Sequence, residues 1–287
     1  MRNIGIYYAY WTDDWDTDFL PFIPKVKSLG FDQLEINGGA LVSLSKGERQ
    51  RLKESALENG ITLSYGIGLT ADHDVSSLNE SIRKEGVNFM KKMIGAVAEM
   101  GGGMIGGTVH SYWPATAPDD LSVKKQILMK SHQSMKEMIP MAEDLNVILN
   151  VEVINRFEQF LLNTCQEAVD YVEIINSPNC KILLDTFHMN IEEDSFGDAI
   201  RLAGSHLSAL HLGETNRKPP GCGRIPWSEI KTALDDIHFE GPLVMEPFIK
   251  PGGQVGKDIA LWRDLMPTAD LDNEAAKSVQ FVKKHLL

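Results

Sequence analysis

Apolar stretches of two kinds alternate along the whole chain. Short runs with the length and composition of buried strands occupy residues 3–10, 31–36, 61–66, 103–109, 147–152, 181–185, 207–211 and 242–246. Longer segments with a helical spacing of apolar residues lie between them, at 22–29, 48–58, 81–100, 124–145, 164–175, 196–203, 227–237 and 272–287. The pattern predicts eight strands, each followed by a helix.

Eight such units favour parallel strands joined by right-handed crossovers. The chain has 287 residues, the size of one (β/α)8 barrel. We therefore expect an α/β fold, a single (β/α)8 TIM barrel domain over residues 1–287 with an extra C-terminal helix. An open doubly wound sheet is the alternative. No GxGxxG motif opens a helix after a strand, so Gly101–Gly103 are interpreted as a helix stop, and Gly106 and Gly107 as a close-approach site.

Four of the predicted strands end in a residue that can bind a divalent metal. They are Glu152, Asp185, His211 and Glu246, separated by 33, 26 and 35 residues. Strand ends of a parallel barrel converge at one mouth, so these side chains are expected to meet. Three carboxylates and one imidazole suit Mn²⁺, Mg²⁺ or Co²⁺, and the lack of a thiolate disfavours a structural zinc site. Taken singly, each residue is also compatible with a helix N-cap, a solvated turn or a core histidine.

Further polar and aromatic residues follow the same strands. Glu158, His188 and Arg217 can form hydrogen bonds to a polyhydroxylated ligand, although an ion-paired surface loop is the alternative interpretation. Aromatic residues gather after the first and fourth strands: Tyr7, Tyr8, Tyr10, Trp11, Trp15, Tyr112 and Trp113. Such residues form the wall of a pocket, or they pack in a loop or a subunit interface.

Composition narrows the class of partner. The formal net charge of −12 disfavours nucleic acid. The three cysteines, Cys165, Cys180 and Cys222, include no CxxC pair, which fits a reducing cytoplasm without disulfides. Neither a signal-peptide core nor an apolar run long enough for a bilayer is present. We expect a cytoplasmic protein without nucleic-acid or membrane partners.

Several segments resemble the ketose 3-epimerases, the D-tagatose 3-epimerase and D-psicose (D-allulose) 3-epimerase group of the xylose-isomerase-like barrel superfamily. The resemblance runs almost from end to end and is carried by residues 5–11, 111–114, 152–158, 184–193, 223–227 and 245–248. The most specific parts are Leu184-Asp185-Thr186-Phe187-His188-Met189-Asn190 and Asn155-Arg156-Phe157-Glu158.

The resemblance implies metal-dependent epimerisation of free ketohexoses at C3 through a cis-enediolate, D-fructose to D-psicose or D-tagatose to D-sorbose. It implies one divalent ion per subunit, most readily Mn²⁺, with Co²⁺ or Mg²⁺ as alternatives. The implied metal ligands are Glu152, Asp185, His211 and Glu246, and the implied acid–base pair is Glu152 and Glu246. A small ketose is the implied partner, and a homodimer or homotetramer the implied assembly.

The same resemblance assigns substrate-binding positions. Glu158, His188 and Arg217 match residues around O1 to O3 of the sugar. Tyr7, Trp113 and Phe248 match the hydrophobic wall that faces its distal end. The chain departs from the family near Ile67, where relatives carry a histidine, and the loop at 37–40 varies in the family. These departures leave the preferred ketose open.

Other functions remain as alternatives. An aldose–ketose isomerase, a hydroxypyruvate isomerase or an inosose dehydratase of the same superfamily would use a similar metal centre. A nuclease of the apurinic type needs several zinc ions and a basic groove, which the negative charge and the lack of further histidine ligands disfavour. A non-catalytic sugar-binding protein has no need for two opposed glutamates on one metal.

Overall fold

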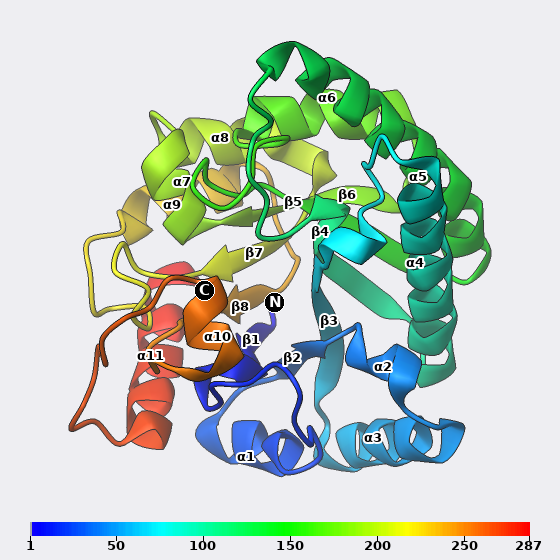
Figure 1. The fold of residues 1–287 in the computed structure, drawn as a ribbon. Coiled ribbons are helices and arrows are strands. Elements are labelled where there is room, and N and C mark those ends of the chain that lie inside the picture. The colour runs from blue at the N-terminus through cyan, green and yellow to red at the C-terminus, as the bar shows by residue number, and fades with distance from the viewer. Residues whose placement is uncertain (1) are drawn as a thin grey trace.

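The computed structural model describes residues 2–287. Eight parallel strands close into a barrel in sequence order, and helices surround it (Figure 1). The strands are β1 (Ile4–Tyr7), β2 (Gln33–Asn37), β3 (Thr62–Leu69), β4 (Gly103–Tyr112), β5 (Val147–Glu152), β6 (Cys180–Asp185), β7 (Leu207–Leu212) and β8 (Leu243–Met245). The predicted (β/α)8 barrel is therefore confirmed.

Eight helices lie close to the predicted segments. They are α1 (Phe22–Leu29), α3 (Lys46–Asn59), α4 (Glu80–Met100), α5 (Lys124–Asp144), α6 (Cys165–Ile175), α8 (Phe196–Ala203), α9 (Trp227–Asp236) and α11 (Leu271–Leu286). The prediction missed the shorter helices α2 (Ala40–Ser43), α7 (Thr186–Glu192) and α10 (Gly253–Asp258). It also missed the 3-10 turns η1 (Tyr8–Tyr10), η2 (Ala71–His73), η3 (Leu121–Val123) and η4 (Gly204–His206). Such segments are shorter than the window of about 11–18 residues over which a helical spacing of apolar residues can be recognised.

Some predicted boundaries were wrong for identifiable reasons. The first strand ends at Tyr7 rather than at residue 10, because the chain turns into η1. The hydroxyls of the buried Tyr8 and Tyr10 donate to the carbonyls of Trp15 and Leu271. Helix α3 begins at Lys46 rather than at residue 48. Its N-cap is Ser45, whose side chain accepts from the Glu48 N–H while the Glu48 carboxylate accepts from the Ser45 N–H.

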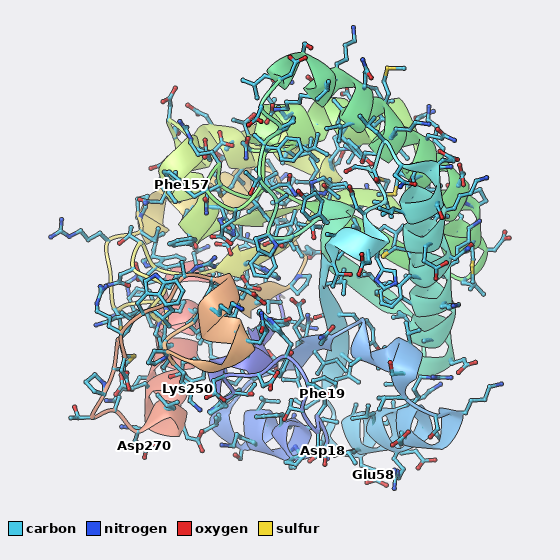
Figure 2. The ribbon with its side chains drawn as sticks, viewed as in Figure 1. Asp18, Phe19, Glu58, Phe157, Lys250 and Asp270 are labelled. Carbon is cyan, nitrogen blue, oxygen red and sulfur yellow. The ribbon has the colours of Figure 1, made fainter. Side chains whose placement is uncertain are left out.

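Along β2, apolar side chains face the helices, while the polar side chains of Gln33 and Glu35 face the barrel interior with Ser64 of β3. Leu34 and Ile36 of β2 are fully buried in the hydrophobic core, and side chains fill the space between strands and helices (Figure 2). Ser208 of β7 donates to Asn150 of β5. Because these strands are not neighbours, both side chains point into the barrel. No helix among the described residues has the length and apolarity needed to cross a membrane.

Gly107 marks a close approach between two strands. Its φ is +115°, and a Cβ atom at this position would overlap the carbonyl oxygen of Ile67 on β3. The pairing of β4 with β5 shifts register between Gly107 and Thr108. The interpretation of Gly107 as a close-approach site is confirmed, and this irregular part of β4 lies beside the barrel mouth.

We expect Gly107→Ala to destabilise the fold by at least about 1–3 kcal/mol, since the new Cβ meets a backbone carbonyl in a strained conformation. The matched control is Gly95→Ala within α4, where the added Cβ lies 3.5 Å from the Met141 methyl group. That change should stabilise the protein by about 0.5–1 kcal/mol, because alanine favours a helix interior. Urea unfolding of both variants measures the difference, and equal midpoints would contradict the assigned strain.

Candidate active site

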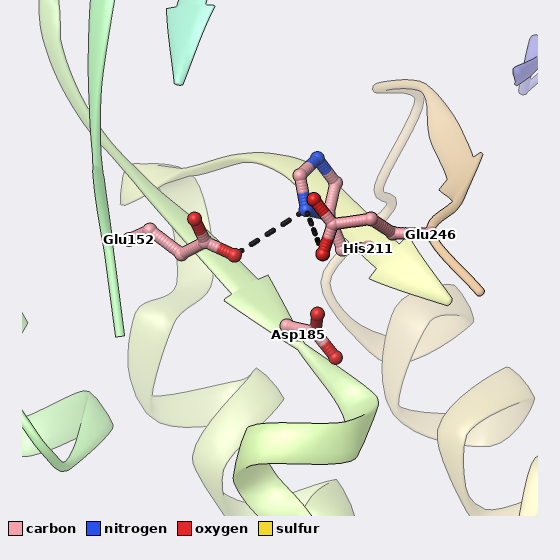
Figure 3. Close-up of side chains that lie close together, drawn as sticks. All are labelled: Glu152, Asp185, His211 and Glu246. Atoms are coloured by element: carbon pink, nitrogen blue, oxygen red, sulfur yellow. Dashed lines mark ion pairs between the residues drawn. The ribbon is translucent and has the colours of Figure 1, made fainter. Parts of the chain in front are cut away.

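The predicted strand ends bring four potential ligands together at the barrel mouth. Glu152, Asp185, His211 and Glu246 each offer a ligand atom, and all four atoms lie within 4.8 Å of one another. Asp185 and His211 are direct partners in the β6–β7 register. Nδ1 of His211 lies 3.3 Å from Glu152 Oε1 and 3.6 Å from Glu246 Oε2 (Figure 3). The arrangement can hold one metal ion.

Burial controls the charge of this group. It raises the pKa values of Glu152, Asp185 and Glu246 above their ordinary values, because the ionised carboxylates lose solvation. For His211, burial by itself lowers the pKa, but the charges of Glu246 and Glu35 outweigh it and raise that pKa well above the usual value. The group therefore takes up protons readily, and a cation among the carboxylates would replace those protons.

The donor set fits a divalent cation. Asp185 Oδ1 accepts from the Phe187 N–H at 2.6 Å and caps α7, while Asp185 Oδ2 is buried without a hydrogen-bond partner. His211 Nδ1 also lacks a hydrogen bond. Asp185 thus serves both as an N-cap and as a potential ligand, two interpretations that the sequence left as alternatives. Carboxylate and imidazole donors suit a hard or borderline ion.

A second polar group lies beside the first and is built around Glu158. The carboxylate accepts from Asn155 Nδ2 at 3.0 Å, from Trp113 Nε1 at 3.1 Å and from Arg217 at 3.2 Å. Burial by itself raises the pKa of Glu158, but the charge of Arg217 and the hydrogen bonds from Asn155 and Trp113 hold it below its usual value. Glu158 is therefore an ionised acceptor at neutral pH.

The same network sets the protonation of His188. Asn155 Nδ2 lies 2.7 Å from His188 Nδ1 and donates to it, which leaves the ring proton on Nε2. Burial lowers the pKa of His188, so the imidazole is neutral. His188 lines the cavity, where its Nε2–H can donate a hydrogen bond.

Arg217 is held between two aromatic rings. Its guanidinium carbon lies 3.8 Å from the ring centre of Phe187 and 5.2 Å from that of Phe248. Its backbone has a φ of +61°, an uncommon conformation for a residue with a side chain. One of its terminal nitrogens, Nη1, is buried without a hydrogen-bond partner. This donor, 3.7 Å from Glu246 Oε2, is available to a ligand.

All the predicted site residues except Asp185 line one cavity of about 440 Å³, and Asp185 is buried next to His211. Tyr7, Trp15, Trp113 and Phe248 form its aromatic wall, with Trp15 6.1 Å from both Trp113 and Phe248, ring centre to ring centre. The other aromatic residues near the first strand do not reach the cavity. Tyr8 and Tyr10 are fully buried, and Trp11 donates to Asp272 on α11.

Two further polar residues of the predicted loops lie outside the cavity. Arg156 pairs with Glu192 at 2.6 Å on the surface. Glu214 accepts from the backbone of Gly221 and Ile225 and from Trp227 Nε1, so it organises the loop before α9. This contact explains the Gly223–Trp227 motif in structural terms.

Sequence reasoning identified only part of the opposite wall of the cavity, Ile67 and the loop at 37–40, which the cavity reaches at Asn37 and Gly39. It missed Ser43 of α2, Thr70 after β3, His73 of η2 and Phe89 of α4. The His73 ring stacks on Phe89 with centres 4.3 Å apart. Glu35, inside β2, was also missed, although an acidic residue within an apolar strand is itself a signal of a buried polar contact.

Comparison with known proteins agrees with this geometry. The profile of a family described as xylose isomerase-like TIM barrel matches residues 23–266. D-psicose 3-epimerase of Ruminiclostridium cellulolyticum is 46% identical over 96% of this chain and 95% of its own length. The Agrobacterium fabrum D-psicose 3-epimerase is 43% identical over 96% of both chains. The crystal structure of D-psicose 3-epimerase with D-tagatose from Clostridium cellulolyticum H10 superposes with a TM-score of 0.96, at 46% identity, over 99% of both chains.

The raised pKa values of the site carboxyls predict a pH-dependent stabilisation by metal. A carboxyl whose pKa is higher in the folded chain favours folding when protonated, so the metal-free protein loses this stability as pH rises through those values. A cation requires the ionised forms and binds more tightly as pH rises.

We therefore expect Mn²⁺ to raise the melting temperature little near pH 5 and strongly near pH 8. A hundredfold excess over Kd adds about 2.7 kcal/mol at the higher pH. Differential scanning fluorimetry with and without Mn²⁺ measures both shifts. Equal shifts at the two pH values would show that protons and metal do not compete at this site.

Proposed function

The chain belongs to the xylose isomerase-like TIM barrel family and, within it, to the epimerases that act on ketoses, and we propose that it inverts C3 of free ketohexoses. The names of its relatives favour D-psicose and its C3 epimer D-fructose, with D-tagatose and D-sorbose as a second pair. One observation carries the proposal. Glu152 and Glu246 reach the same small volume from non-adjacent strands, beside Asp185 and His211.

The proposed metal ligands are Glu152, Asp185, His211 and Glu246, holding one divalent ion, most readily Mn²⁺, with Co²⁺ or Mg²⁺ as alternatives. The buried unpartnered atoms of Asp185 and His211 support this assignment. Bound there, the ion supplies a Lewis acid that stabilises negative charge on the substrate oxygens at C2 and C3.

His188, Arg217 and Glu158 are proposed to orient the carbonyl end of the sugar. His188 donates through Nε2–H and Arg217 through Nη1, both toward O1 and O2, where negative charge develops. Glu158 accepts from a sugar hydroxyl while Asn155 and Trp113 hold it in place. Because these donors and acceptors are already fixed by their neighbours, little reorganisation accompanies binding.

Tyr7, Trp113 and Phe248 are proposed to contact the distal end of the ketose. Tyr7 and Phe248 pack edge to face with ring centres 6.1 Å apart. Their surfaces exclude water from the reacting carbons and make apolar contacts with the C–H groups of the sugar.

Glu152 and Glu246 are proposed to move the proton. The hydrogen on C3 is weakly acidic because the C2 carbonyl is adjacent, and its loss gives a cis-enediolate. Inversion requires one group that removes the proton from one face and another that returns a proton to the opposite face. Burial raises the pKa of both glutamates, which brings proton uptake and release closer to neutral pH.

A cytoplasmic homodimer or homotetramer completes the proposal. The number of subunits follows what the family resemblance implies. Multi-angle light scattering of the purified chain determines the number of subunits.

Replacing either glutamate by its amide should lower turnover by about 10²–10⁴-fold, since a general acid–base group is lost. In D₂O, Glu152→Gln and Glu246→Gln should each still exchange the C3 hydrogen of one epimer, and the two variants should act on different epimers. Proton NMR follows both the exchange and the product. If a single variant exchanged the C3 hydrogen of both epimers, the assignment of Glu152 and Glu246 to opposite faces of C3 would be refuted.

The matched controls separate proton transfer from metal binding. Glu192→Gln alters a carboxylate that pairs with the exposed Arg156 outside the cavity, and it should keep full turnover. Asp185→Asn should lose activity that excess Mn²⁺ partly restores. Excess Mn²⁺ should not restore Glu152→Gln or Glu246→Gln.

The proposed reaction predicts that D-fructose and D-psicose interconvert without formation of an aldose. Chromatography of products from D-fructose, D-psicose, D-tagatose and D-sorbose with Mn²⁺ or Co²⁺ identifies the preferred pair. EDTA should stop the reaction and added Mn²⁺ should restore it. If an aldose were the main product, the protein would be an aldose–ketose isomerase instead. Full activity in the presence of EDTA would show that the reaction does not need a metal ion.

A further inference from the structure

Glu35 of β2 is a buried carboxylate that faces the metal site from across the barrel. Its side chain is 5% exposed. Glu35 Oε1 lies 3.1 Å from His211 Nε2. Neither of these two atoms forms a hydrogen bond, although they lie close enough for one.

The two ring nitrogens of His211 therefore face different partners. Nδ1 points to the glutamates of the candidate metal site (Figure 3), and Nε2 points to Glu35. A cation can bind Nδ1 only when that nitrogen carries no proton, so the single proton of the neutral ring must sit on Nε2. An acceptor beside Nε2 favours this tautomer.

The surroundings of Glu35 fix its carboxylate in the required orientation. Its second oxygen, Oε2, accepts from Ser64 Oγ at 2.7 Å, and Ser64 Oγ accepts from Gln33 Nε2 at 2.7 Å. Gly66 leaves room beside Oε1, where a Cβ atom would lie 3.3 Å from that oxygen and 2.9 Å from the Tyr7 ring. Oε2 is thus held by the sheet, and Oε1 is left for His211.

We propose that Glu35 is a positioning residue of the metal centre, which accepts the Nε2–H of His211 and holds Nδ1 toward the cation. This inference rests on the proposed metal site. A carboxylate behind a ligating histidine fixes the ring and strengthens its donor nitrogen, and the loss of such a partner typically weakens metal binding about 10–100-fold.

Isothermal titration of the chelator-stripped full-length protein with Mn²⁺ tests this role. Glu35→Gln should raise the Kd for Mn²⁺ about 10–100-fold. Ser64→Ala keeps the carboxylate but removes the donor that orients it, and it should raise the Kd by a smaller factor. This second variant keeps the inference testable if Glu35→Gln fails to fold.

A purely structural role for Glu35 predicts a different result. Asp74 is also a buried carboxylate, 8% exposed and bonded to Ser76 outside the site. Asp74→Asn should change the melting temperature without changing the Kd for Mn²⁺. The visible absorption of bound Co²⁺ should shift in Glu35→Gln but not in Asp74→Asn.

The possible outcomes are distinct. An unchanged Kd, within twofold, in folded Glu35→Gln and Ser64→Ala overturns the role of Glu35 and leaves the metal site intact. Failure of the unmodified protein to bind Mn²⁺ overturns both the metal site and the role of Glu35. A higher Kd for Mn²⁺ in Glu35→Gln and Ser64→Ala, with the Kd of Asp74→Asn unchanged, supports the proposal.

Discussion

Three carboxylates of like charge meet at the barrel mouth with little access to water, and the rest of the site is arranged around the resulting repulsion. Glu152 and Asp185 are buried and Glu246 is nearly so. In a medium of low polarity such a group must take up protons, bind a cation or find cationic neighbours. His211 and Arg217 provide part of the compensation, at distances of 3.3 to 3.9 Å. A bound divalent ion would complete it.

The repulsion between these carboxylates explains why the surrounding loops are connected by several hydrogen bonds. Thr186, next to Asp185, donates to the Gly213 carbonyl and accepts from the Gly213 N–H, which joins the loop after β6 to the loop after β7. The Phe248 N–H donates to the Arg217 carbonyl and connects the loop after β8 to the same structure. Charged groups that would repel one another in a loose loop are thereby held at fixed separations, which is what preorganised electrostatics requires.

The sequence was informative where the backbone alone determines position. Strand ends of a parallel barrel converge, so the convergence of Glu152, Asp185, His211 and Glu246 could be predicted from spacing. Glu35 lies within its strand, where its residue type signals a buried polar contact, but the sequence does not identify His211, on a non-neighbouring strand, as the partner. His73 and Phe89 were also out of reach, since the path of η2 over the mouth depends on packing rather than on a local pattern.

The two sides of the cavity therefore differ in how far they can vary. The candidate catalytic side comes from β5 to β8 and the segments after them, where Glu158, Asp185 and His188 are each held by hydrogen bonds to neighbouring residues. The opposite wall, with Ile67, His73 and Phe89, has fewer such connections. The chain has the apolar Ile67 near the position where the family it resembles carries a histidine, so this wall is less polar at that point. This wall can therefore vary in shape without moving the charged groups on the other side of the cavity.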